Sequence, residues 1–299
     1  IFTLKVISMK KSIKIALIAI VAIGIVAAIA YFAQSIGSGV TKVIATTDFE
    51  KQVQDSVNKN IKGKDFPSAR IAFNSILAEI NTEASITLGD GKKSLSSSEV
   101  AKSKQIVFYE YAPIFTDYGT KYFTRSSWDD NTLKDLKGEA TTLLQLKIAE
   151  TGTDVDRDLK SIIKNVDEYY AAWKVANAAS RCTSVSAIAS YKTQANNYLH
   201  SPLTNNASLS SALRNAEAAA KNSVVRNIAG YCNHIASSYT HYGSYAAFYS
   251  AYNSGLNRIN EYKNKYGMPS QLNSAKSSLN AADSRALSYY STEDTDSGI

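Results

Sequence analysis

The chain contains two cysteines, Cys182 and Cys232, whose thiols could be joined as a disulfide. An even number of cysteines is typical of disulfide pairing in proteins that work outside the reducing cytoplasm. Cys182 precedes a predicted helix over residues 184–199, and Cys232 lies near the end of the next predicted helix, over 207–236. An antiparallel hairpin would bring these ends together, although its two arms differ in length by roughly 16 Å. We therefore expect a disulfide, with two buried free thiols as the alternative.

Tyrosine is concentrated in the C-terminal half, where 12 of the 19 tyrosines lie after residue 180. Tyr242, Tyr245, Tyr249 and Tyr252 recur at intervals of three, four and three residues, which places them on one face of a helix. A tyrosine ring can stack on a sugar or a peptide while its hydroxyl forms hydrogen bonds, and Arg258 follows on the same predicted helix. These five residues are the candidate binding site. The alternative is that the rings fill space between helices rich in alanine and serine.

Other polar residues do not form a pattern that predicts catalysis or metal binding. His234 and His241 are seven residues apart, but a predicted helix break separates them and no carboxylate lies near enough in sequence to complete a metal shell. The acidic clusters at 129–130 and 154–158 fit helix starts, and the cluster at 167–168 fits a solvated helix face. Neither a glycine-rich phosphate loop nor a nucleophile elbow is present. We expect no enzymatic activity and no cofactor.

The N-terminal segment predicts export or membrane attachment. Residues 1–12 form a basic n-region, and Met9 followed by lysines is typical of a bacterial start, so residues 1–8 would precede the true start. Residues 13–33 are predicted to be a transmembrane signal anchor or a signal peptide. Within them Ile15–Ala33 carries no charge, and as a helix it would be about 28 Å long, close to the ~30 Å thickness of the hydrocarbon core.

Two interpretations of this segment remain open. As a signal anchor, Ile15–Ala33 would span the lipid bilayer with the flanking lysines on the cytoplasmic side. As a signal peptide, it would be cleaved near Ala28-Ile29-Ala30 and the remainder would be secreted. Both interpretations place the rest of the chain outside the cytoplasm, after a flexible linker over residues 34–47.

The net charge of +7 is unevenly distributed. Four lysines precede the apolar segment, and residues 34–180 carry 19 basic and 20 acidic side chains. Residues 181–290 carry 10 basic side chains and three acidic ones, so the excess of positive charge lies there. Because these charges are thinly spread, we interpret them as a solvated surface that could meet an anionic polymer, and we expect no nucleic-acid partner.

Hydrophobic periodicity predicts an all-α fold, a bundle of about nine antiparallel helices. The predicted helices lie at about 48–61, 66–85, 97–122, 130–148, 154–176, 184–199, 207–236, 242–265 and 270–290. Pro113 should kink or divide the third helix near Ala112. We divide the body into an N-terminal helical part over 48–180 and a tyrosine-rich, basic part over 181–290. The acidic tail over 291–299 is expected to be disordered.

These features predict a membrane-tethered, extracytoplasmic helical module of the bacterial envelope that has a structural or protein-interaction role. The alternative is an envelope-facing binding module for a glycan, an anionic polymer or a peptide, which would use the tyrosine-rich half. The first prediction depends on the N-terminal segment and the helical periodicity. The second depends on the spacing of the tyrosines.

Overall fold

The computed structural model describes residues 45–87, 91–146 and 154–296. This part of the chain contains ten α-helices, two short 3-10 helices and a single antiparallel bridge between Thr87 and Lys93, so the expected all-α class is confirmed. The predicted anchor, Ile15–Ala33, lies outside the described residues. Among the helices that are described, none combines the length and the apolar character needed to cross a bilayer.

The chain divides into two compact units, and the boundary between Asp167 and Glu168 falls within helix α6. The first unit contains α2 (Asp48–Asn60), α3 (Phe66–Ser85), α4 (Ser97–Tyr122), α5 (Asp130–Leu146) and the beginning of α6 (Asp154–Ala179). The second contains the rest of α6, α7 (Ile188–Asn196), η1 (Leu203–Asn205), α8 (Ala207–Arg214), α9 (Ala216–Ser237), η2 (Tyr239–His241), α10 (Tyr245–Tyr266) and α11 (Ser270–Asp296).

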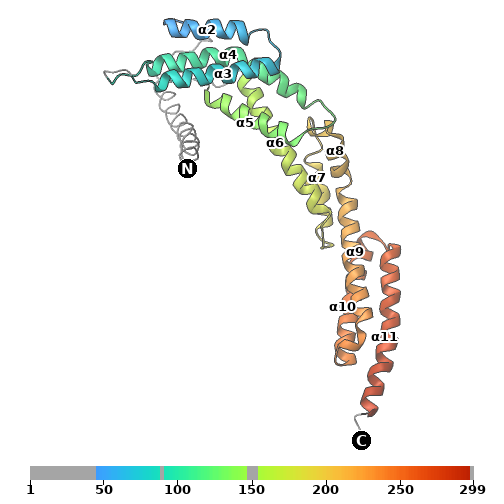
Figure 1. The fold of residues 1–299 in the computed structure, drawn as a ribbon. Helices are drawn as coiled ribbons and strands as arrows, with labels where there is room; N and C mark the ends of the chain where they lie inside the picture. Colours follow the sequence, from blue (N-terminus) through green and yellow to red (C-terminus); the bar gives the residue numbers. More distant parts are fainter. Residues whose placement is uncertain (1–44, 88–90, 147–153, 297–299) are drawn as a thin grey trace. The chain divides into compact units, whose positions relative to one another are not determined.

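The core of the first unit forms where α2, α3 and α4 pack together (Figure 1). Helix α3 shows why the sequence produces this arrangement. Phe73, Ile76 and Ile80 recur at intervals of three and four residues, which places them on one face, and all three are buried. The ring of Phe73 stacks on the ring of Tyr111 from α4, with 4.1 Å between the ring centroids. The apolar stripes of neighbouring helices therefore cover each other.

The second unit is built around α9, which contacts α7, α10 and α11 (Figure 1). Helix α11 also packs on α10, and its buried side chains recur every three or four residues: Leu272, Ala275, Leu279, Ala282, Ala286 and Tyr290. The small residue Gly255 lets α10 approach its neighbours closely. A Cβ atom there would lie 3.0 Å from Leu279 Cδ1 and 3.3 Å from Cys232 Sγ.

Several predicted helix boundaries differ from the structure, and each difference has a local cause. Helix α4 continues through Pro113 without a division, because residues on both sides of the proline, including Ala112 and Phe115, are buried. Tertiary packing there offsets the helix-breaking cost of about 3 kcal/mol. The helix predicted over 207–236 ends after α8 and resumes as α9. Asn215 lies at the break, and asparagine competes with helical backbone hydrogen bonds.

Two further boundaries also need correction. Residues 184–187 form a turn in which Ala187 N donates to Ser184 O, so α7 begins only at Ile188. Disorder is predicted over residues 291–299, but α11 continues to Asp296, and residues 297–299 lie outside the described part of the chain. Buried Tyr290 anchors this part of α11, and the hydroxyl of Thr292 donates to helix carbonyls one turn back.

Candidate functional site

Three of the predicted binding residues form a continuous row of rings on α10. Ser244 caps this helix by accepting a hydrogen bond from Ala247 N, and the spacing of Tyr245, Tyr249 and Tyr252 then places them on one side. The ring centroids of Tyr245 and Tyr249 are 5.7 Å apart. Those of Tyr249 and Tyr252 are 5.6 Å apart, with an angle of 20° between the ring planes. Tyr249 is 44% exposed, whereas the other two rings are half-buried.

Side chains from α11 hold the half-buried tyrosines in place. The hydroxyl of Tyr245 donates to Asp283 Oδ1 at 3.0 Å, and that of Tyr252 donates to Asn280 Oδ1 at 3.1 Å. Partial burial, together with the hydrogen bond to Asp283, raises the pKa of Tyr245. The rings are therefore fixed before any ligand arrives.

Helix α11 also contributes an exposed apolar side chain beside these polar groups. Leu287 is 55% exposed and lies four residues after Asp283 and seven after Asn280, so the three share one side of α11. We call the combined surface the tyrosine seam. It consists of Tyr245, Tyr249 and Tyr252 from α10 and Asn280, Asp283 and Leu287 from α11.

The other two predicted binding residues lie elsewhere. Tyr242 precedes α10, where its ring packs edge-on against Phe248 and its backbone N–H donates to the hydroxyl of Tyr290 at 3.1 Å. The Arg258 guanidinium lies over the ring of Tyr231 from α9, 3.9 Å from the ring centroid. Arg258 is nine residues after Tyr249, a rotation of about 900°, which puts it on the opposite side of α10. It therefore does not serve the tyrosine seam.

The predicted disulfide is absent from the structure, in which Cys182 and Cys232 are free, buried thiols. Cys182 Sγ donates to Ser184 O at 3.3 Å, while Cys232 Sγ contacts Gly255 O at 3.7 Å. Cys232 lies sixteen residues beyond the start of α9 at Ala216, about 24 Å along the helix axis, and the short α7 cannot match that length. Burial raises the pKa of Cys232 to about 11, so its reactive thiolate is scarce.

The histidines and acidic residues do not assemble into a metal or catalytic site in the described part of the chain. No group of three or more potential ligands lies close enough there to hold a metal ion. His200, which follows the predicted helix over 184–199, has its Nδ1 atom 3.1 Å from Ser201 O and its Nε2 atom 3.8 Å from Glu168 Oε2. The second contact links the turn after α7 to α6.

Two polar clusters in the first unit bring together residues that are far apart along the chain, so the contacts between their parts are not predictable from the sequence. In the first, Glu139 on α5 accepts hydrogen bonds from Tyr111 on α4 and, at 2.7 Å, from Arg70 Nε on α3. Burial raises the pKa of Glu139, and the two partners only partly oppose that rise. Burial also acts to lower the pKa of Arg70, but Glu139 and Asp135 raise it overall. The cluster links three helices.

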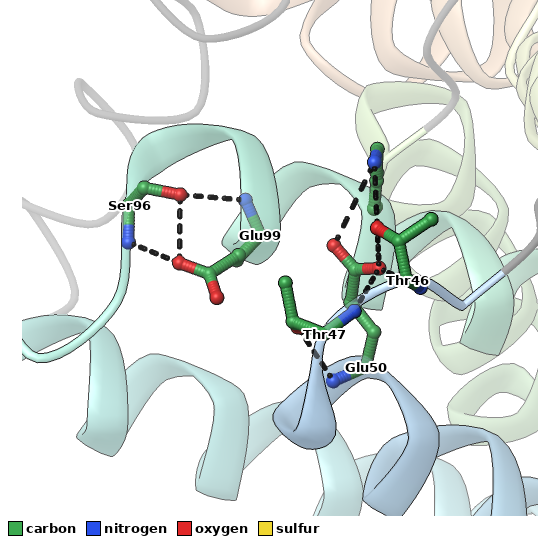
Figure 2. Close-up of polar contacts among 6 residues, drawn as sticks. Thr46, Thr47, Glu50, Ser96 and Glu99 are labelled. Carbon is green, nitrogen blue, oxygen red and sulfur yellow. Dashed lines mark hydrogen bonds and ion pairs between the residues drawn. The ribbon is translucent and has the colours of Figure 1, made fainter.

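The second cluster joins the beginnings of α2 and α4. Figure 2 shows two capping boxes beside each other, Thr47 with Glu50 and Ser96 with Glu99. Glu50 is fully buried, and its Oε2 atom accepts hydrogen bonds from the backbone N–H groups of Thr46 and Thr47 (Figure 2). Hydrogen bonds from Ser96 lower the pKa of Glu99. The cluster holds Thr46 and Thr47 in place just before α2.

Of the site residues predicted from the sequence, Tyr245, Tyr249 and Tyr252 are therefore the ones that form one accessible surface. The cysteines are buried, Arg258 is engaged with α9, and Tyr242 packs against the core residue Phe248. Comparison of the chain with protein-family models, with curated proteins and with solved structures yielded no match.

Proposed function

We propose that the protein is a membrane-tethered, extracytoplasmic helical module that binds a partner protein of the bacterial envelope through the tyrosine seam. The observation that carries this proposal is the exposed ring of Tyr249, held between the rings of Tyr245 and Tyr252. The basic n-region and the apolar Ile15–Ala33 segment of the sequence support the tether.

The side chains of the tyrosine seam are already held in place, which favours binding. Ordering a side chain on association costs about 0.5–1.5 kcal/mol, and hydroxyls already bonded to Asn280 and Asp283 avoid part of that cost. Tyrosine is enriched at the centre of protein interfaces, where a ring provides contact area and the hydroxyl provides polarity. Exposed Leu287 adds apolar area on the neighbouring helix. The seam is thus a preorganised surface of mixed aromatic and polar character.

Site-specific photocrosslinking in cells tests the proposal. A photoreactive residue at position 249 should give discrete crosslinked products with an envelope protein. The same residue at position 170 is the control, because Tyr170 is 37% exposed in the same unit but lies on α6. Tyr249→Ala should abolish the complex while changing the free energy of unfolding by about 0.5 kcal/mol or less. A loss of several kcal/mol in Tyr249→Ala, or equal crosslinking at both positions, would show that the ring is only a packing residue.

A glycan is the second candidate for the same surface. The ring planes of Tyr245 and Tyr249 are 30° apart and those of Tyr249 and Tyr252 are 20° apart, and a row of nearly parallel rings could stack on successive sugars. Asn280 and Asp283 lie beside them and could bond sugar hydroxyls. Retention on purified envelope glycan that is lost in Tyr249→Ala and kept in Tyr249→Phe would favour this candidate over a protein partner.

A further inference from the structure

A hollow of about 440 Å³ lies between η1 and the outer side of α8. Thr204 and Asn205 form one wall, and Ser210, Ser211 and Arg214 form the other. The hollow lies at the beginning of α9, whereas the tyrosine seam begins just after its end. A helix of 22 residues is about 33 Å long, so the two surfaces are separate.

The sequence of α8 explains why this space exists. One face of the helix carries four residues, because Ser210, Ser211 and Arg214 follow Ala207 by three, four and seven residues. Three of these side chains are small, so they leave room that a larger residue would fill. The other face carries Leu209 and Leu213, both buried in the core of the unit.

The hydroxyl of Ser210 is the most informative group in the hollow. The residue is only 4% exposed, and its Oγ atom has no hydrogen-bond partner among the residues that the structure describes. A buried hydroxyl without a partner is unfavourable, and native proteins usually satisfy such groups. Because Ser210 lines the hollow, rotation of its side chain about χ1 would turn the hydroxyl toward a ligand atom there, which would supply the missing partner.

The positive charge of Arg214 favours a negatively charged ligand in the hollow. Arg214 lines it, and no acidic side chain does. Within the described residues, Arg214 has no ion-pair partner. The nearest acid in sequence, Glu217, is bound by Lys192 at 2.8 Å and by Lys221 at 2.7 Å, so its charge is neutralised. The guanidinium and the neighbouring hydroxyls therefore present hydrogen-bond donors around an unopposed positive charge.

We propose that this hollow binds an oxyanion, a carboxylate or a phosphate group carried by a small hydroxylated molecule. Arg214 would pair with the anionic oxygens, and the Ser210 hydroxyl would donate to one of them. Thr204 and Ser211 would bond the hydroxyl groups of the ligand. The volume lies within the range of ~300–1,000 Å³ that is usual for small-molecule sites and suits a ligand of about one sugar unit.

Isothermal titration calorimetry on the full chain in detergent micelles tests the proposal, with glycerol phosphate and glucuronate as probes. Arg214→Gln should weaken the binding of the preferred probe at least tenfold. The matched control is Arg226→Gln, which removes the same charge from an exposed position on α9 outside the hollow and should change the affinity less than twofold.

Ser210→Ala is the second variant, with Ser208→Ala on the exposed side of the same helix as its control. Ser210→Ala removes a buried, unpaired hydroxyl, so the protein should fold with an unchanged or higher unfolding temperature while binding weakens severalfold. Saturable binding of glycerol phosphate alone identifies a phosphate site, and binding of glucuronate alone identifies a carboxylate site. The proposal fails if neither probe saturates, or if Arg226→Gln weakens binding as much as Arg214→Gln.

Discussion

Glu139 is a carboxylate that the first unit buries between Arg70 and Tyr111. Its side chain is 11% exposed, whereas that of Arg70 is 35% exposed. The carboxylate therefore loses more hydration than the guanidinium does when the protein folds, and this loss raises the pKa of Glu139. The protonated form is thus favoured in the folded state relative to the unfolded chain.

This shift predicts how stability changes with pH. The stability that protonated Glu139 supplies should be complete below its unfolded pKa, about 4.3, and should be lost as the pH rises through the higher folded pKa. Each pKa unit corresponds to about 1.4 kcal/mol. Urea unfolding between pH 4 and 8 should show wild type losing stability relative to Glu139→Gln as the pH rises.

The control for this experiment is Asp135→Asn. Asp135 contacts the same arginine at 3.3 Å, but its side chain is 61% exposed, so its pH profile should follow wild type. If wild type instead gains stability relative to Glu139→Gln as the pH rises, the ion pair with Arg70 outweighs the burial of the carboxylate.

At the residue scale, the sequence predicts which residues lie on the same face of one helix. The row formed by Tyr245, Tyr249 and Tyr252 follows from spacing alone. The same arithmetic places Arg258 on the opposite side of α10, so its separation from the row was also predictable. The contact between Arg70 and Glu139 could not be predicted, because helical periodicity does not relate residues on α3 and α5. It depends on how the helices pack.

At the scale of elements, the most predictable helix starts are those that carry a capping box. The motifs Thr47-x-x-Glu50 and Ser96-x-x-Glu99 are recognisable in sequence, and both form capping boxes in the structure. Their hydrogen bonds are local, so distant packing does not decide them. The passage of α4 through Pro113 and the break at Asn215 depend on which neighbouring residues are buried, and local signals do not report that.

Removing a cap should destabilise the first unit measurably. Ser96→Ala deletes the hydroxyl that accepts a hydrogen bond from Glu99 N at 3.2 Å and should cost about 1 kcal/mol in the free energy of unfolding. Ser97→Ala is the matched control, because Ser97 is exposed at the first position of α4. Chemical denaturation should separate the two variants, and an equal cost in both would argue against the capping role of Ser96.

At the scale of the whole molecule, the proposed topology makes the sharpest prediction. A reporter that is active only outside the cytoplasm, inserted at Gln271, should be active in the full chain, because the basic residues flank one side of the apolar segment. Gln271 is exposed near the start of α11 and should tolerate the insertion. Activity would be measured in intact bacterial cells.

The control carries the same insertion in residues 34–299 alone, which lack the proposed tether and should leave the reporter inactive in the cytoplasm. Activity in the shortened chain, or inactivity in the full chain, would contradict the proposed topology. Mass spectrometry of the mature protein would then separate the two interpretations of the segment, because a chain that begins at Tyr31 has lost its anchor.

Because Cys182 and Cys232 are free thiols, export to an oxidising compartment would make the rate of folding important. Both are buried, and the structure does not bring them within bonding distance of each other. In the oxidising compartment proposed here, each thiol is protected only while the segment around it stays packed. Between export and folding, each cysteine could therefore form a disulfide with a thiol of another molecule. Rapid closure of α9 against α10 would shield Cys232 from that chemical damage as well as stabilise the unit.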